Sequence, residues 1–206
     1  MITEGLTYNS EGKYWIVRYS WIKDPNDLPN NIAVAIARMK CTERLNKVGS
    51  DYMKMYYDQN RDMVNRGVAK KGSLTEMNAY KGPVHYTHHH EVLKQSSTST
   101  PFRIVFNSSA DYKGHILNDY WAKGRDILND LVGLLLRLRQ NNTAVVGDIA
   151  KMYNAVKLEE LEQYTHRIVW RDVDSSKTPE HYMLTAVAFR DRSSGVIAAT
   201  ALKKLL

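Results

Sequence analysis

The chain contains 206 residues, of which 29 are Lys or Arg and 22 are Asp or Glu, so its formal net charge is +7. With 43% hydrophobic and 25% charged residues, its composition is that of an ordinary folded protein and excludes disordered, collagen-like and coiled-coil classes. Its apolar runs are far shorter than the roughly 20 residues that a membrane-spanning helix needs, so we expect no membrane association.

The chain begins Met-Ile-Thr-Glu-Gly, with no basic stretch followed by an apolar one, so we read no secretory signal. A single cysteine, Cys41, cannot form an internal disulfide, and we expect a reduced, buried thiol in a cytoplasmic or nuclear protein. The positive charge is spread evenly along the chain, which favours an anionic partner held across a folded surface. A solvated, mildly basic surface explains the charge equally well.

The first part of the chain predicts one short strand and then two helices. Residues 1–30 are rich in Gly, Asn, Asp and Pro and contain one alternating run over 14–19, so we interpret them as an entry segment or linker. Apolar residues then recur at helical spacing from Ile32, and a second amphipathic stretch runs from Asp51 until Gly67 ends it. Together these two stretches predict a helical hairpin.

A group of histidines lies in the irregular stretch over residues 70–100, which we expect to form loops or a hairpin. His85 and the run His88–His90 raise the question of a metal site. Adjacent residues of an extended strand point to opposite faces, however, and no Cys or acidic residue stands at a zinc-like spacing. The pattern therefore favours structural histidines over metal ligands.

The second part of the chain mixes strands and helices at irregular spacing. The predicted elements, in chain order, are a strand over Phe102–Phe106, a leucine-lined helix over Ile127–Leu138, strands over Thr143–Ile149, His166–Trp170 and Tyr182–Phe189, and a helix from a capping Ser193 to Leu206. The spacing is too irregular for a βαβ array, so we predict an α+β fold.

The segment from Ala144 to Val156 carries the most informative pattern. A single carboxylate, Asp148, stands at the end of an apolar run, and an aromatic residue, Tyr153, follows five positions later. Such an arrangement can hold a divalent metal at a sheet edge beside a nucleotide sugar. On spacing alone, a strand that ends in an acidic turn explains the pattern better.

This segment resembles motif A of reverse transcriptases, and its neighbours resemble, in the same order, the reverse transcriptase region of Bel/Pao-type LTR retrotransposon polyproteins. The resemblance covers nearly the whole chain. Its blocks are Tyr14–Val17, Leu28–Asn31, Gly82–Tyr86, His89–Val92, Pro101–Ala110, Gly147–Tyr153, Arg167–Arg171 and Tyr182–Leu206.

The resemblance implies part of a right-hand polymerase. Residues 31–142 would form the helical hairpin and the fingers, and residues 143–206 the first part of the palm, after the entry segment. The parent would copy RNA or DNA template-primers with deoxynucleotides and Mg²⁺ by two-metal nucleotidyl transfer.

The same resemblance assigns roles to individual residues. Asp148 would bridge two Mg²⁺ ions with help from the Ile149 carbonyl, and Tyr153 would stack under the incoming sugar and exclude a 2′-hydroxyl. Arg103 stands where the family clamps the triphosphate with a bidentate arginine. Lys94 is a further candidate for binding the same anion.

Several positions depart from the family pattern. Arg190 stands where motif B usually has Gly, Gly195 replaces a common Pro, and Asn107 replaces a frequent Asp. The 206 residues contain no Tyr-x-Asp-Asp, the signature of motif C, and one carboxylate cannot hold two Mg²⁺ ions. We therefore expect this chain not to polymerise. The alternative is a relic that binds nucleic acid or a partner without catalysis.

A palm that lacks the motif C hairpin would leave a strand edge and an apolar face uncovered. We therefore also expect self-association through this unpaired edge.

Overall fold

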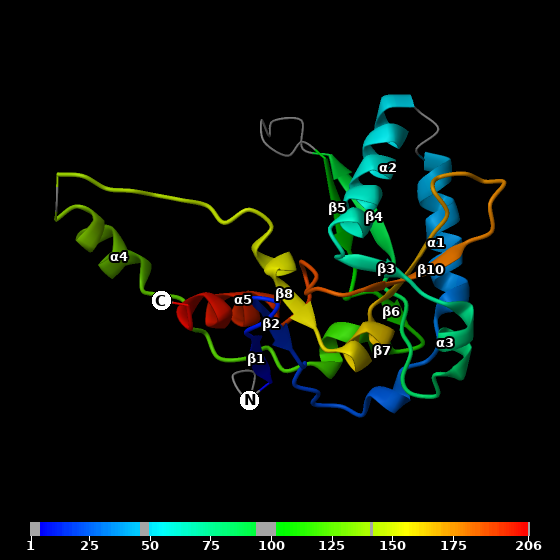
Figure 1. Cartoon of the computed structure of the whole chain (residues 1–206), viewed down its shortest axis with the longest axis horizontal. Coiled ribbons are helices and arrows are strands. Elements are labelled where there is room, and N and C mark those ends of the chain that lie inside the picture. Colours follow the sequence, from blue (N-terminus) through cyan, green and yellow to red (C-terminus); the bar gives the residue numbers. More distant parts are fainter. Residues whose placement is uncertain (1–4, 46–49, 94–101, 141, 206) are drawn as a thin grey trace.

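The computed structural model describes residues 5–45, 50–93, 102–140 and 142–205, and it has a mixed α+β fold built on small sheets (Figure 1). Within these ranges, none of the helices is long and apolar enough to cross a membrane. The elements are β1 (Leu6–Asn9), β2 (Tyr14–Val17), η1 (Pro25–Asp27), α1 (Ile32–Leu45), α2 (Ser50–Asn65), β3 (Ala69–Lys71), α3 (Leu74–Ala79), β4 (His89–Leu93), β5 (Phe102–Phe106), β6 (Asp111–Tyr112), β7 (His115–Ile116), η3 (Leu117–Tyr120), α4 (Leu131–Leu138), η4 (Met152–Ala155), β8 (Val156–Leu158), η5 (Glu160–Thr165), β9 (Arg167–Trp170), β10 (Glu180–Leu184) and α5 (Ser194–Lys203).

The first sheet joins the N-terminal hairpin to the last quarter of the chain. Its order is β1-β2-β8, with β1 and β2 antiparallel and β2 and β8 parallel. Val17 and Trp121 are fully buried beside this sheet, and Ile197 of α5 packs into the same core. Residues 1–30, expected to be an entry segment with one strand, thus contain two strands and supply Tyr19 and other core side chains.

The second sheet has the order β3-β10-β9, with antiparallel pairs throughout. All four residues of β9 are buried, as expected for a strand with covered faces, and Ile168 and Trp170 pack with Leu184 of β10. The predicted strand over 166–170 is confirmed. The strand predicted over 182–189 is shorter and ends at Leu184.

The helices α1 and α2 form where apolar spacing predicted them, and the turn between them lies outside the described residues. The end of α2 is set by Gly67, whose φ is +62°, because only glycine enters this region without a steric cost. The Gly67 amide donates to the Val64 carbonyl (2.9 Å), and the Val68 amide donates to the Met63 carbonyl (2.8 Å). The sequence prediction of this stop is confirmed.

The hairpin of β4 and β5 packs against both helices, with His90 opposite Val105 and Val92 opposite Arg103. The strand predicted over Phe102–Phe106 is confirmed. The residues that connect β4 to β5 lie outside the described ranges, and Lys94 is among them.

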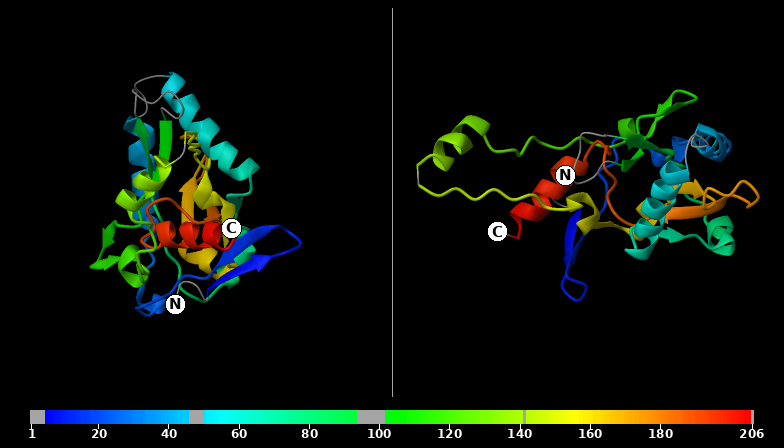
Figure 2. Two further views of the ribbon diagram at one scale, coloured as in Figure 1. Left: turned by 90° about the vertical axis from the view of Figure 1, so that its left-hand side faces the viewer. Right: turned by 90° about the horizontal axis from the view of Figure 1, so that it is seen from above.

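A long excursion, here called the arm (residues 123–150), leaves the rest of the molecule between η3 and η4. Figure 1 and the right panel of Figure 2 show it extending away from the sheets, with α4 near its tip. The leucines of α4 are exposed, and Val145 and Val146 are 89% and 83% exposed. The strand predicted over Thr143–Ile149 does not form, because no described strand lies beside this segment to accept and donate its backbone hydrogen bonds. The leucine-lined helix also begins later than predicted, at Leu131.

Candidate nucleic-acid interface

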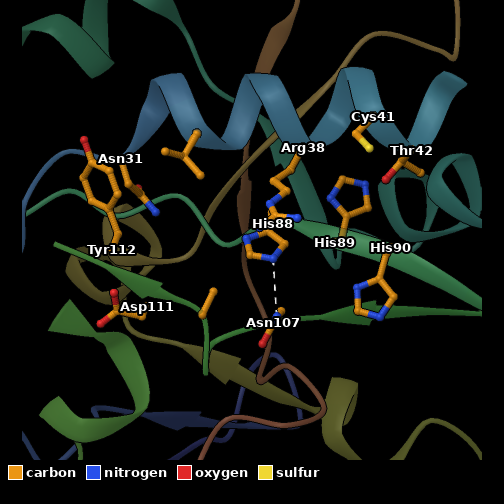
Figure 3. A pocket seen from close by; sticks show the side chains of 12 residues that line it. Asn31, Arg38, Cys41, Thr42, His88, His89, His90, Asn107, Asp111 and Tyr112 are labelled. Atoms are coloured by element: carbon orange, nitrogen blue, oxygen red, sulfur yellow. Dashed lines mark hydrogen bonds between the residues drawn. The ribbon is translucent and has the colours of Figure 1, made fainter. Parts of the chain in front are cut away.

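A cavity of about 430 Å³ lies between α1, β4 and the segment 107–112 that follows β5 (Figure 3). The helix contributes residues 31, 34, 38, 41 and 42, which share one face because residues three and four apart in a helix are neighbours. His88, which precedes β4, and His90 within β4 line the cavity; Asn107 lies across the cavity from the helix, and Tyr112 lies beside Asn31 at the start of the helix. Three separate segments therefore meet at this cavity.

The lining of the cavity contains one arginine, one aspartate and many hydrogen-bonding groups. Arg38 projects from α1 beside His88, whose Nε2 lies 3.3 Å from Asn107 Nδ2. Partial burial lowers the pKa of His88, and the nearby charges of Arg38 and His90 lower it further. The imidazole of His88 is therefore neutral near pH 7, and Arg38 supplies the fixed positive charge.

This set of groups suits a phosphate with a base beside it. A guanidinium binds a phosphate through charge-assisted hydrogen bonds, imidazole and amide groups add donors, and the Tyr112 ring offers a face for stacking. One carboxylate, Asp111, lies at the same end as Tyr112 and disfavours a second phosphate there. The cavity also includes Cys41, which is exposed, so the expectation of a buried thiol is wrong.

His89 of the run and the separate His85 are buried and pack in the core. His89 stacks on Tyr56 with ring centroids 5.8 Å apart, and the Asn31 amide lies 3.3 Å from His85 Nε2. Burial lowers the pKa of each of these histidines to about 4, and neighbouring histidines add to the effect. Within the described ranges, no group of three or more His, Cys, Asp or Glu side chains could hold a metal ion.

The residues assigned to nucleotide binding are spread over two regions. Arg103 is exposed in the middle of the β4–β5 hairpin, and Lys94 falls outside the described residues. Tyr153 lies in η4, where its half-buried ring packs against Phe189 with centroids 5.5 Å apart. Phe189 precedes Arg190, so the structure places Tyr153 beside the segment that contains Arg190.

Asp148 and Ile149 lie on the arm and are exposed. Asp148 does not sit at the end of a strand, because the strand expected there is not formed. A pair of Mg²⁺ ions needs several oxygen ligands, and the described residues contain no group of three or more His, Cys, Asp or Glu side chains at Asp148 that could hold a metal ion. The described part of the chain therefore does not fit a two-metal centre, and we derive no catalytic step through one.

Arg190 adopts a backbone conformation that favours glycine. Its φ is +87°, and its carbonyl accepts a hydrogen bond from the Asn118 amide (3.1 Å). The side-chain oxygen Oδ1 of Asn118 in turn accepts a hydrogen bond from the Arg192 backbone amide (2.8 Å). The Asn118 side chain therefore binds the backbone on both sides of Asp191. Gly195, the other departure, lies in the first turn of α5.

Sequence reasoning missed the cavity. Arg38 occurs on a helix whose apolar spacing was read only for its core, and its spacing from Asn31 by seven residues is the one signal that both face the same side. The partners across the cavity come from residues 88–112 and could not be paired with Arg38 without the fold.

No family model matches this chain, and no curated protein is significantly similar to it.

Proposed function

We propose that this chain is the fingers and the first part of the palm of a reverse transcriptase similar to those of Bel/Pao-type retrotransposons. The ordered blocks of sequence that resemble that family are the basis of the proposal. On this proposal the parent protein copies RNA or DNA template-primers from deoxynucleotides, and Mg²⁺ binds where further carboxylates join Asp148.

The observation that carries the nucleic-acid part of this proposal is the cavity of Arg38, His88, His90, Asn107 and Tyr112. It combines one fixed cation with neutral donors and an aromatic ring, which is how proteins bind a strand with little sequence preference. The cavity adjoins the β4–β5 hairpin, the element that carries the proposed triphosphate ligand.

Two further features support a polymerase palm. The contact of Tyr153 with Phe189 joins two motifs that are 36 positions apart in sequence. The positive φ of Arg190 occurs at the position where the family usually has Gly, so the backbone there has the conformation that a glycine would provide.

A second candidate, from a different class, is a nucleic-acid-binding or interaction protein without catalysis. Arg190 favours this alternative, because its bulky side chain occupies a turn that the polymerase needs to keep open to nucleotide and template. The exposed position of Asp148 favours it too, because within the described ranges no group of three or more His, Cys, Asp or Glu side chains could hold a metal ion there.

Binding of a fluorescent primer-template, followed by anisotropy across a salt series, tests the interface. We expect Arg38→Gln to weaken binding about tenfold and to reduce the log–log salt slope by about one, because one phosphate contact is lost. The matched control is Arg44→Gln, which removes the same charge from the last turn of α1 outside the cavity. Equal losses in both variants would mean that only overall charge matters, and the absence of binding by the unaltered chain would contradict the proposal.

Primer extension separates the two candidates. We expect no incorporation by the 206-residue chain, since one carboxylate cannot hold two Mg²⁺ ions. Incorporation that Asp148→Asn abolishes would refute this expectation. Sequencing of the transcript beyond the codon for Leu206 gives an independent answer: an open frame into Tyr-x-Asp-Asp supports the polymerase, and an immediate stop codon supports the non-catalytic protein.

A further inference from the structure

A buried polar cluster joins four segments that are far apart in the sequence. Its centre is Asp191, in the loop before α5, and around it lie Tyr19 after β2, Ser108 after β5 and His166 before β9. The side chains of Asp191 and His166 are both 0% exposed. The proposed function uses none of these groups.

Asp191 accepts hydrogen bonds from two of its neighbours and faces the third, His166, across an ion-pair distance. The Tyr19 hydroxyl donates to Oδ2 and the Ser108 hydroxyl donates to Oδ1, each at 2.6 Å. His166 Nε2 lies 3.3 Å from Oδ2, an ion-pair distance. A buried carboxylate with this many donors is held in its ionised form, because each donor stabilises the negative charge.

His166 faces an oxygen atom at each ring nitrogen. Nδ1 lies 2.8 Å from the backbone carbonyl of Glu162, and a carbonyl can only accept, so Nδ1 carries a proton. Nε2 faces the carboxylate of Asp191. The ring is also stacked on Trp121, with centroids 5.1 Å apart and an interplanar angle of 6°. Both nitrogens are therefore placed as donors, which is the hydrogen-bonding pattern of the cationic ring.

We propose that His166 and Asp191 form a buried imidazolium–carboxylate pair that fixes the loop 189–193 onto the core. Arg190, within this loop, has a positive φ that is strained for a residue other than glycine. Such a conformation persists only where contacts of the neighbouring residues hold the backbone in place. The Asp191 side chain points inward to the pair, and its backbone carbonyl accepts from the amide (3.0 Å) and the hydroxyl (2.8 Å) of Ser194 at the start of α5.

The charges around the pair favour its ionised form. Burial opposes protonation of His166, but Asp191 and the Glu162 carbonyl outweigh burial and raise the pKa of the imidazole. Burial likewise opposes ionisation of Asp191, whereas His166, Ser108 and Tyr19 lower the pKa of its carboxyl.

Two other titratable side chains face this region. The Glu162 carboxylate adds negative charge, and the pKa of His85, already lowered by burial, is lowered further by the positive charge of His166. His85 therefore stays neutral while His166 is charged.

The pair acts as a positioning device with a defined pH range. Since the pKa of His166 is raised, the anchor is complete below the ordinary histidine value of about 6.5 and is lost as the pH rises through the pKa in the folded protein. The relevance of this loop to nucleotide binding rests on the proposed function, whereas the pair and its effect on the loop do not.

Nitrogen-15 NMR of the histidine rings in the unaltered chain tests the proposal directly. We expect His166 to show two protonated nitrogens at pH 7, and we expect Asp191→Asn to lower its pKa, since only Glu162 then opposes the effect of burial. A singly protonated, neutral His166 at pH 7 in the unaltered chain would overturn the proposal, whether or not the variant folds. The matched control, Asp119→Asn, removes an exposed carboxylate that contacts Arg192 in the same loop and should leave the titration of His166 unchanged.

Amide hydrogen exchange measures the effect on the loop. In Asp191→Asn we expect residues 189–193 to exchange at least tenfold faster, and in Asp119→Asn by less than threefold. Should Asp191→Asn fail to fold, Tyr19→Phe removes one donor to the carboxylate and should accelerate exchange of the same loop by a smaller factor. Unchanged loop exchange in a folded Asp191→Asn variant, or in Tyr19→Phe where that variant is used, would overturn the positioning role. Primer-template binding is independent of these readouts, so a failure of the proposed function would be seen separately.

Discussion

The buried histidines His85 and His89 make the stability of the protein depend strongly on mild acid. Only 3% of His85 and 4% of His89 is exposed, and the pKa of each is about 4 in the folded protein, against about 6.5 in an unfolded chain. Because the unfolded state binds protons more tightly, the stability that these neutral rings contribute is present above pH 6.5 and is lost as the pH falls from there towards 4. We therefore expect the free energy of unfolding to fall when the pH is lowered from 7 to 5.

The size of the loss follows from the two pKa values. Lowering the pH from 7 to 5 costs about 2 kcal/mol for each histidine, or about 4 kcal/mol for both, when a pKa unit is worth about 1.4 kcal/mol. This is a large share of the roughly 5–15 kcal/mol by which domains are stable. His166 opposes part of the loss, because its raised pKa makes its stabilising contribution grow as the pH falls from 7 to about 6 and stay nearly constant below that.

Urea unfolding at pH 7 and pH 5 measures this loss. His89→Leu should remove about half of the difference between the two pH values, since its ring packs between Tyr56 and Phe106 and an apolar side chain can take that place. Ile197→Val, in the separate core beside the first sheet, is the control: it should lower the free energy of unfolding equally at both pH values. If His89→Leu loses as much stability between pH 7 and pH 5 as the unaltered chain, the reasoning from burial is refuted.

Three further predictions concern other parts of the molecule. Arg190→Gly should raise the free energy of unfolding by about 1 kcal/mol, because glycine relieves the cost of a positive φ; a lower melting temperature in this variant would contradict the strain. Glu43→Gln should cost about 3 kcal/mol in urea unfolding, since the Arg171 guanidinium, bonded to Glu43 at 2.9 Å through Nε, would stay buried without its carboxylate; a loss below 1 kcal/mol would count against it. The chain should self-associate through the apolar face of α4, so Leu131→Gln combined with Leu135→Gln should lower the mass measured by light scattering; a monomeric unaltered chain would disprove this.

The elements predicted correctly from the sequence are those whose signals are local. The helical spacing from Ile32, the stop at Gly67 and the β-branched and aromatic run of β5 each depend on neighbours within a few residues. The buried strand β9 was also predicted from a local signal, its own short run of residues. An α+β fold follows from the order of such elements.

The failures come from contacts that the sequence does not specify. The run Thr143–Ile149 has the composition of a strand, but a strand forms only where another strand pairs with it, and the arm has no such neighbour among the described residues. Conversely, β8 is only three residues long and forms because β2 lies beside it. Cys41 was predicted to be buried because cysteine is among the residues most often found in protein cores. In the structure its side chain is exposed and lines the cavity.

The candidate site was predictable only in part. Tyr153 and the motif B segment were both found by resemblance, but their contact through Phe189 needed the fold. The partners of Arg38 and the cluster around Asp191 come from segments many tens of residues apart, and no spacing rule joins them.

The parallel pairing of β2 with β8 bears on how the protein folds as it is made. Val17 is paired with Leu158, so the N-terminal hairpin must wait for about 140 further residues, or on the order of ten seconds at about 5–20 residues per second on the ribosome. During that interval its apolar face has no native cover. A nascent chain released early would thus expose this hairpin to chaperones and proteases, and synthesis past β8 is the step that ends its vulnerability.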